Sequence, residues 1–404
     1  MKFSNTQEQF FELLRAGLFP DKEARILEHG SSVDWRGIYC LAEEQAVMGL
    51  IAAGIENLPS SERPAKEIAL QFAGQTIQLE QRNKAMNAFV AKLIEKYRKE
   101  DVYTLLVKGQ GIAQCYERPL WRACGDIDLL LSLDNFEKAS FVLDNYSRET
   151  SRETSKDIER KHREYHIDGW TVELHGTMHT NLSRGIDKWI DKVQEDVFCG
   201  GKVRSVEFKS SNGSRLASPT VDATRQSSSV LGSALTASTV QVFLPAPDED
   251  VIFVFTHILQ HLFLEGIGLR QICDWCRLLW TYKDSLNYGL LESRIKAMGL
   301  MTEWKVFASL AVQYLGMPET AMPMFGSNVH EFKLEAARLM DFVLKVGNFG
   351  HNREVEWSNG FKRRTSLIWH RITDTFKLSF VFPLDAPKFL LNYAVDGVRG
   401  LMRW

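Results

Sequence analysis

The sequence predicts an α+β protein in which a mixed-sheet core lies between two helical regions. Apolar residues follow helical spacing through residues 1–98, strand-like apolar runs and an Asp-Gly turn occupy residues 99–247, and helical spacing returns in residues 248–404. A chain of 404 residues is long enough for two or three domains. We therefore expect an N-terminal helical region, a core and a C-terminal helical domain with these bounds.

The N-terminal region predicts four helices, each with a helical apolar pattern or a recognisable start or stop signal. Asp34 is a candidate N-cap for the second helix, Pro59 stops the third, and Pro64 lies near the first turn of the fourth. The expected helices cover Phe10 to Leu18, Trp35 to Leu41, Val47 to Leu58, and a long segment that ends near Lys99.

The core contains two acidic residues within an apolar run. A predicted strand over residues 102–107 ends at Lys108-Gly109, and Asp126 and Asp128 lie in a second predicted strand. Residues two apart on a strand point to the same face, so the two carboxylates project together while Ile127 points into the core. Unpaired carboxylates are costly in a buried strand. The pattern therefore favours a site for a divalent cation over an exposed strand end.

The rest of the core predicts a helix and two hairpins. A helix is expected over residues 135–145, and a polar tandem repeat over 147–155 is expected to be a solvated loop. Asp168-Gly169 separates strands over 164–167 and 170–175, which is a strong hairpin signal. Residues 209–238 are rich in serine, and we expect a loop or disordered insertion in a hairpin of strands 202–208 and 239–244.

These motifs resemble those of a known superfamily. Lys108-Gly109 followed by Arg122-x-x-Gly125-Asp126-Ile-Asp128 is similar to the active-site core of the DNA polymerase β-like nucleotidyltransferases. More narrowly, the lysine-glycine form and the ending Glu173-Leu-His175 resemble an uncharacterised bacterial nucleotidyltransferase family. The resemblance implies a polymerase β-like mixed-sheet core, with the same order of helices, long helix and lysine-glycine strand.

The resemblance also implies a site and a reaction. Glu173 would be the third carboxylate beside Asp126 and Asp128, holding two Mg²⁺ ions, with Mn²⁺ as an alternative, and Glu173 is also a candidate general base. The reaction would move a nucleoside monophosphate from a nucleoside triphosphate such as ATP to a hydroxyl-bearing acceptor, with release of pyrophosphate. The residues expected to bind the nucleotide are Lys108, Gly109, Arg122, Gly125 and Asp126, with Arg122 as a clamp for phosphate or carboxylate.

A further group of residues is expected near the metal or the acceptor. His257 and His261 share a helix face, and they suggest zinc ligands, acceptor-facing groups or ordinary core histidines. No third zinc ligand is evident in the sequence near them. The resemblance favours a role behind the metal ligands or facing the acceptor over zinc, and ordinary core histidines remain an equal alternative. The group is completed by His175, Arg270 and Asp274.

The net charge of −2 gives no general attraction for a long nucleic acid, so a small-molecule acceptor is preferred. Two alternatives remain open: a toxin-like enzyme that adenylylates a protein, and a non-catalytic nucleotide-binding protein. Residues 1–20 form an amphipathic pattern and no stretch is apolar enough to span a membrane, which predicts a cytoplasmic protein.

Cys273 and Cys276 form a single Cys-x-x-Cys pair without a second pair, and we expect them to pack in the core. Aromatic residues near the C-terminus suggest either packing in the helical domain or contact with a membrane surface, and their frequency favours packing. These are Trp369, Phe376, Phe380, Phe382 and Trp404.

Overall fold

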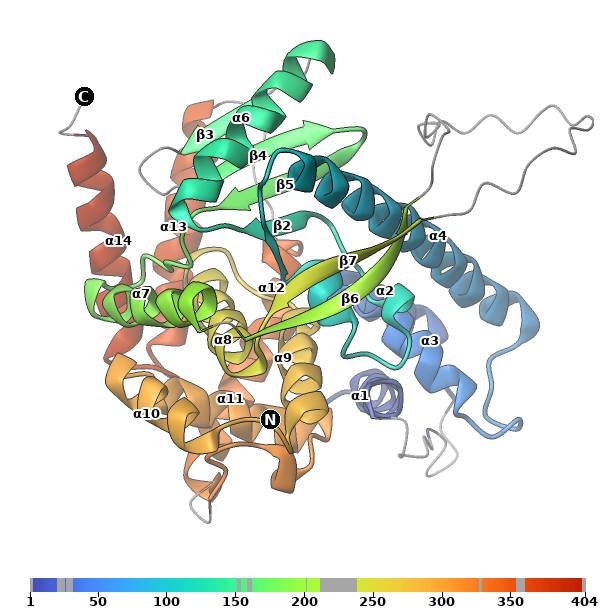
Figure 1. Cartoon of the computed structure of the whole chain (residues 1–404). Coiled ribbons are helices and arrows are strands. Elements are labelled where there is room, and N and C mark those ends of the chain that lie inside the picture. The colour runs from blue at the N-terminus through green and yellow to red at the C-terminus, as the bar shows by residue number, and fades with distance from the viewer. Residues whose placement is uncertain are drawn as a thin grey trace, which may run out of the picture.

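A computed structural model confirms the α+β architecture, with one mixed sheet surrounded by helices (Figure 1). The structure describes residues 3–19, 26, 32–150, 154–157, 162–200, 202–210, 238–326, 329–353 and 360–401. The strands are β1 (Leu105–Val107), β2 (Ile127–Leu130), β3 (Thr154–Asp157), β4 (His162–Ile167), β5 (Trp170–His175), β6 (Val203–Ser210) and β7 (Ser238–Pro245).

Along the chain, helices precede the strands, separate them and follow them. Before and among the strands lie α1 (Asn5–Leu18), α2 (Trp35–Glu44), α3 (Met48–Glu56), α4 (Lys66–Lys99), α5 (Gly109–Ala113), α6 (Leu133–Thr150) and α7 (Arg184–Cys199). After them lie α8 (Pro247–Leu264), α9 (Leu269–Tyr282), α10 (Tyr288–Met298), α11 (Met301–Leu315), α12 (Lys333–Val346), α13 (Gly360–Leu378) and α14 (Asp385–Leu401).

The seven strands are ordered β3-β4-β5-β2-β1-β7-β6. Strand β2 runs antiparallel to β1 and parallel to β5, so the sheet is mixed at its centre. In this register Asp128 lies beside Val107 on one side and beside Glu173 on the other. The predicted Asp-x-Asp strand is therefore the central element, with both of its neighbours contributing to the same face.

Alternation along the strands separates two hydrophobic cores on opposite faces of the sheet. Leu106, Ile127 and Leu174 belong to the core that α4 and α6 cover. Leu105 and Leu130 point the other way, into a larger core that includes α8 and α9. Asp128 occupies this second face, so the sheet directs the site toward α8.

The larger core also joins the two ends of the chain. It contains Phe10 from α1 together with Trp275 from α9 and Trp304 from α11, all fully buried. Arg15 donates to the carbonyl of Tyr314 at 3.2 Å, which ties α1 to α11. The N-terminal helices therefore pack on the C-terminal helices. The division of the chain into three domains remains a prediction.

Several local predictions are confirmed. Asp34 accepts a hydrogen bond from the amide of Gly37 and caps α2, and the long helix ends at Lys99. Asp168 and Gly169 have φ values of 51° and 81°, which suit the two-residue turn expected between β4 and β5. Strands β6 and β7 form the expected antiparallel pair. Of the Ser-rich insertion predicted over residues 209–238, residues 209, 210 and 238 belong instead to β6 and β7, and residues 211–237 lie outside the described residues.

Other local predictions are wrong in extent. The first strand begins at Leu105 instead of residue 102, although Val102 is buried. The tandem repeat is not a loop where it is described, because α6 continues to Thr150 and β3 begins at Thr154. Arginine and glutamate favour helix, and β3 gains its partner only through β4, a contact that local polarity does not reveal. Residues 151–153 are not among those described.

Helix α7 was not predicted, yet its sequence carries clear signals. Ser183 caps the helix by accepting from the amide of Ile186, and the buried residues fall at helical spacing. These buried residues are Ile186, Ile190, Val193 and Val197. The helix contacts α8, and its Asp191 and Gln194 line the pocket described below.

The C-terminal aromatic residues are only partly packed. Phe382 is buried as expected, but packing was the wrong prediction for Trp369, Phe376 and Phe380, whose exposed fractions are 65%, 67% and 56%. Trp404 lies outside the described residues. Cys273 and Cys276 are both fully buried in the larger core, which confirms their packing role.

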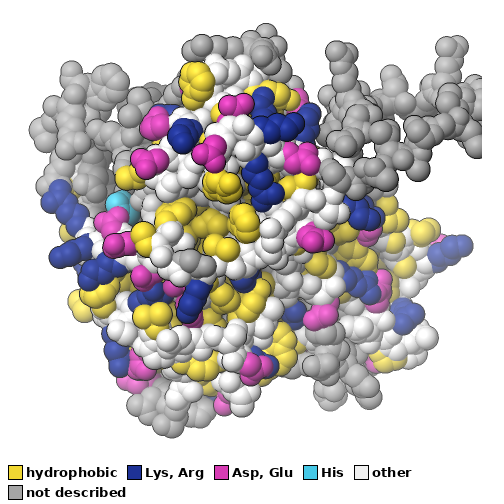
Figure 2. Space-filling model, viewed as in Figure 1, with side chains coloured by type: hydrophobic (Ala, Val, Ile, Leu, Met, Phe, Trp, Pro, Cys, Tyr) yellow, Lys and Arg dark blue, Asp and Glu magenta, His cyan; other side chains and the backbone are white. Residues whose placement is uncertain are grey.

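The face of the molecule shown in Figure 2 carries no dominant charge among the described residues. Basic and acidic side chains lie interspersed over this face, in agreement with the small net charge of the chain. Among the described helices, none combines the length and the apolar character that a membrane crossing needs.

Candidate active site

The site begins at the turn between β1 and α5. Lys108 has a φ of 53° and Gly109 a φ of 24°, so two consecutive residues adopt positive φ. This conformation is uncommon for a lysine and is typical of strained functional positions. The turn brings the Lys108 ammonium to 2.6 Å from Oδ1 of Asp128. The predicted lysine-glycine turn and Asp-x-Asp strand therefore meet.

The three predicted carboxylates lie on neighbouring strands. Asp126 directly precedes β2, Asp128 lies within it, and Glu173 is the register partner of Asp128 on the parallel strand β5. Ile127, between the two aspartates, is 1% exposed and points into the opposite core, as the two-residue spacing predicts. The carboxyl group of Asp128 is almost fully buried, so its charge requires partners within the protein.

Those partners are a lysine and a histidine. Burial alone would raise the pKa of Asp128, but the Lys108 ammonium and a hydrogen bond with His175 hold it below its usual value. Burial and Lys108 oppose a proton on His175, yet its bonds with Asp128 and Glu173 raise its pKa. The charge of Asp128, helped by burial, raises the pKa of Asp126 to about 6.

Two histidines surround Glu173. Nε2 of His162 lies 3.2 Å from Oε2 of Glu173, and Nε2 of His175 lies 3.4 Å from the same oxygen and 2.8 Å from Oδ1 of Asp128. Burial raises the pKa of Glu173, but the hydrogen bonds from His162 and His175 outweigh it and leave the pKa well below its usual value. Glu173 is therefore a weaker base than a free glutamate.

His162 is a residue that the sequence analysis missed, because the predicted strand began at residue 164. The signal was nonetheless present. A two-residue turn at Asp168-Gly169 pairs Ile167 with Trp170, and five residues further from the turn on each strand it pairs His162 with His175. The hairpin register thus places the two imidazoles side by side, with ring centroids 4.9 Å apart.

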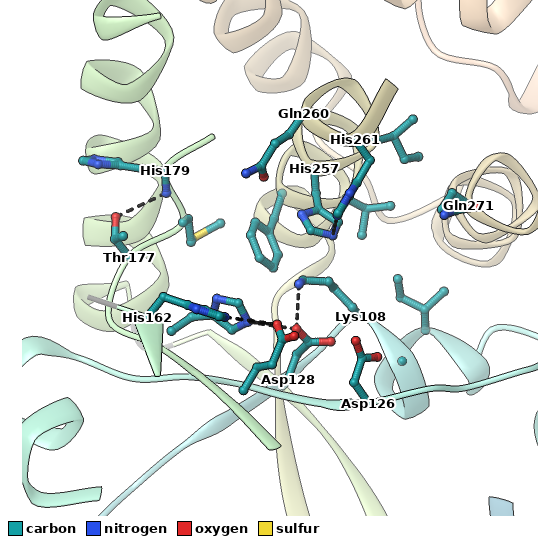
Figure 3. A pocket seen from close by; sticks show the side chains of 18 of the residues that line it. Lys108, Asp126, Asp128, His162, Thr177, His179, His257, Gln260, His261 and Gln271 are labelled. Carbon is teal, nitrogen blue, oxygen red and sulfur yellow. Dashed lines mark hydrogen bonds and ion pairs between the residues drawn. The ribbon is translucent and has the colours of Figure 1, made fainter. Parts of the chain in front are cut away.

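Helix α8 faces the cluster of three carboxylates across the pocket (Figure 3). Nε2 of His257 and Nε2 of His261 lie 3.0 Å apart, and Nδ1 of His261 bonds to Glu265 at 2.9 Å. Burial, together with the nearby Lys108 ammonium, holds the pKa of His257 well below its usual value. His257 is therefore neutral at physiological pH and presents an uncharged imidazole above Lys108.

Arg122 clamps a carboxylate of the protein itself, whereas the sequence analysis expected it to bind the nucleotide. Its Nε and one terminal nitrogen bond to the two oxygens of Asp274 at 2.9 and 2.5 Å, and Tyr116 donates to the same carboxylate at 2.7 Å. The other terminal nitrogen bonds to the carbonyl of Ala123. The guanidinium donors are thus used to join the loop before β2 to α9.

Arg270 differs from Arg122 in having no carboxylate partner among the described residues. Its guanidinium donates to the carbonyl oxygen of Ala123 at 2.9 Å. Its Nε is buried and has no hydrogen-bond partner among the residues that the structure describes. Burial and the neighbouring Arg122 charge lower its pKa. A guanidinium that lines the pocket without a carboxylate partner is suited to bind an anionic group of a ligand.

These residues line one pocket of about 520 Å³. That volume is typical of small-molecule sites. All of the predicted site residues line it except Gly125, whose position has open space beside it and no contact that demands glycine. The lining also includes residues that were not predicted, among them Thr177, His179, Gln260, Gln271 and Phe253. Figure 3 shows Lys108, Asp126, Asp128 and His162 at the base of the pocket, opposite His257 and His261.

In this fold a lysine turn and three carboxylates meet at the centre of a mixed sheet. The model of a family described as "Uncharacterised nucleotidyltransferase" matches residues 31–316, which is most of the chain. The chain belongs to this family of nucleotidyltransferases, enzymes that transfer phosphorus-containing groups. Neither the curated proteins nor the solved structures include a match to the chain.

Proposed function

We propose that this enzyme is a Mg²⁺-dependent nucleotidyltransferase. It moves a nucleoside monophosphate from a nucleoside triphosphate to a hydroxyl group of a small-molecule acceptor and releases pyrophosphate. The observation that carries the proposal is the meeting of Asp126, Asp128 and Glu173 with Lys108 on one wall of a pocket of about 520 Å³. The order of lysine-glycine turn, Asp-x-Asp strand and parallel Glu173 strand also supports a polymerase β-like core.

The donor set suits magnesium. Asp126, Asp128 and Glu173 offer the carboxylate oxygens that Mg²⁺ prefers, and a pair of ions would need carboxylates from more than one strand. When bound, the ions would neutralise the charge that develops on the attacking and leaving oxygens. The described chain places Lys108 beside these carboxylates, where its ammonium would interact with the triphosphate.

The remaining residues divide between positioning and proton transfer. Arg270, which lines the pocket without a carboxylate partner among the described residues, is the better candidate for a phosphate or acceptor anion, while Arg122 fixes the loop that carries Asp126. The acceptor oxygen forms a bond to the α-phosphorus as the bond to pyrophosphate breaks. Its proton passes to a base in the pocket, for which Glu173 is the candidate named from the sequence.

The test uses the purified protein, Mg²⁺, each α-labelled nucleoside triphosphate and a cell extract as the source of acceptors. We expect label transfer to small molecules together with release of pyrophosphate. In Asp126→Asn/Asp128→Asn the rate should fall by about 100-fold or more, because the metal ligands are lost. The matched control is Glu164→Gln, which removes a carboxylate from the neighbouring strand β4 outside the pocket.

The possible outcomes separate the candidate functions. Label on protein bands would favour the protein-modifying alternative over a small-molecule acceptor. Binding of nucleotide without transfer, for every nucleotide tested, would contradict the proposal and favour the non-catalytic alternative. An equal loss of activity in Glu164→Gln would show that the effect of the double substitution is not specific to the site.

A further inference from the structure

The carboxylate wall of the pocket contains a mixed group of imidazoles and carboxylates. His162, Glu173 and His175 each offer one atom, and these atoms all lie within 4.8 Å of one another. Asp128 lies beside this group, since Nε2 of His175 is 2.8 Å from its Oδ1; the same oxygen accepts from the Lys108 ammonium at 2.6 Å, a contact that an ion bound to this oxygen would displace. Three adjacent strands, β4, β5 and β2, supply these side chains. Among the described residues no other such group of three is found.

The distances suit a shared ion. An ion bound at about 2.0–2.1 Å by nitrogen and oxygen holds adjacent ligands about 2.9–3.4 Å apart in octahedral or tetrahedral geometry. The contact of Glu173 with His162 is 3.2 Å, and its contact with His175 is 3.4 Å. The contact of His175 with Asp128 is 2.8 Å. All three lie within or close to the range for ligands of one ion.

The four side chains are held in place, yet an ion can reach them. The side-chain exposures are 31% for His162, 21% for Glu173, 14% for His175 and 2% for Asp128. All four line the pocket, so an ion that enters it reaches them without any opening of the fold. The pairing of β4, β5 and β2 fixes their spacing, which limits the reorganisation that binding would need.

We propose that His162, His175, Glu173 and Asp128 form a metal site selective for a divalent transition-metal ion over Mg²⁺. Imidazole nitrogen is a good ligand for ions such as Mn²⁺, Co²⁺ and Zn²⁺, whereas Mg²⁺ strongly prefers oxygen. Two nitrogens among four ligands therefore shift the preference toward the transition metals. The inference deepens the proposed function, on which it rests in sharing Asp128 and Glu173: a transition-metal ion would be the preferred ion at these two carboxylates, and Mg²⁺ the more weakly bound ion that also supports transfer. It adds His162 and His175 as direct ligands.

The experiment measures metal binding without nucleotide or acceptor, so it does not depend on transfer activity. The full chain is freed of metal with a chelator and titrated with Co²⁺, whose visible absorption reports nitrogen ligands, and separately with Mg²⁺ by calorimetry. We expect one Co²⁺ per chain with an affinity about 100-fold above that for Mg²⁺. In His162→Gln the Co²⁺ affinity should fall by about 10-fold or more, because one of the two imidazole ligands is lost.

Two control variants locate the ion. His179→Gln removes another imidazole that lines the same pocket. His179 bonds to Asp191 and lies outside the proposed ligand set. His257→Gln removes one of the two imidazoles on α8. Both should keep the Co²⁺ spectrum and affinity. Circular dichroism of each variant establishes that the fold is intact, and His175→Gln provides a second test of the site if His162→Gln fails to fold.

The results decide between the proposals. Equal affinities for Co²⁺ and Mg²⁺, or unchanged Co²⁺ binding in His162→Gln and His175→Gln, would overturn the transition-metal site. Loss of the Co²⁺ spectrum in His257→Gln alone would also overturn it, by placing the ion on α8. Tight Co²⁺ binding in a protein that transfers no nucleotide would support the metal site and contradict the proposed function. Transfer activity in a protein that shows no preference for Co²⁺ over Mg²⁺ would support the proposed function and contradict the transition-metal site.

Discussion

Asp126 and Asp128 are separated by one residue, yet their pKa values shift in opposite directions. Asp128 has the Lys108 ammonium at 2.6 Å and a bond with His175, which stabilise its charge and lower its pKa. Asp126 faces the negative charges of Asp128 and Glu173 as well as burial, so its pKa rises to about 6. The two pKa values shift in opposite directions because the Lys108 ammonium is hydrogen-bonded to Asp128.

Removing Asp126 should therefore stabilise the metal-free fold near neutral pH. Because its folded pKa is raised, its stabilising contribution is present below about pH 4 and is lost as the pH rises through about 6. At pH 7.5 with a chelator, we expect Asp126→Asn to raise the free energy of unfolding in urea by about 1–3 kcal/mol.

The control for this prediction is Asp128→Asn, which leaves the buried Lys108 without its carboxylate partner. It should lower the free energy of unfolding under the same conditions. If Asp126→Asn instead destabilises the protein at pH 7.5 and has no effect near pH 4, the assigned repulsion between the carboxylates is incorrect.

At the level of elements, a buried ion pair helps to hold the loop before β2 against α9. Arg122, in the loop before β2, bonds to both oxygens of Asp274 on α9, and both side chains are nearly inaccessible to water. A buried pair of this kind contributes little net stability relative to apolar residues, but breaking it leaves an uncompensated buried charge. Its main effect is to fix the position of the loop that leads into Asp126.

We therefore expect Arg122→Met to lower the free energy of unfolding by about 3–5 kcal/mol. Asp274→Leu should have a similar effect, whereas the double substitution should cost much less than the two single effects together, since no charge is left buried. Urea unfolding of the four proteins measures this coupling. Additive losses would mean that the two residues act independently.

At the level of the whole molecule, the helices before and after the sheet share one hydrophobic core. Phe11 on α1 is 1% exposed and lies near Tyr314 on α11, with ring centroids 6.3 Å apart. Glycines allow close packing within the N-terminal region: a Cβ on Gly17 of α1 would lie 1.9 Å from the carbonyl oxygen of Leu50 on α3. The two regions are therefore expected to unfold together.

Phe11→Ala provides the test of this cooperativity. It should lower the free energy of unfolding by about 3–5 kcal/mol, because a large aromatic side chain is removed from the core. Hydrogen exchange measured peptide by peptide should show reduced protection in α11 as well as in α1. Unchanged protection of α11, with loss confined to α1 and α3, would support separate N-terminal and C-terminal domains.

Much of this organisation was readable from the sequence because it depends on local rules. The spacing of Asp126 and Asp128 sets their common face, the Asp168-Gly169 turn sets the register of a hairpin, and Asp34 caps a helix. The long helix and the strand-forming core follow in the same way from periodicity. A longer predicted strand would also have identified His162, because the hairpin register pairs it with His175.

The rest was decided only by tertiary contacts, because nothing near these residues in the chain determines their partners. Arg122 and Asp274 are 152 positions apart, and their pairing determines that Arg122 clamps a protein carboxylate, whereas Arg270 has no carboxylate partner among the described residues. The pKa of Asp126 likewise depends on which carboxylate Lys108 reaches. The sequence by itself determined which side chains share a face. The packing of the strands and of α8 and α9 around them determined which of these side chains meet.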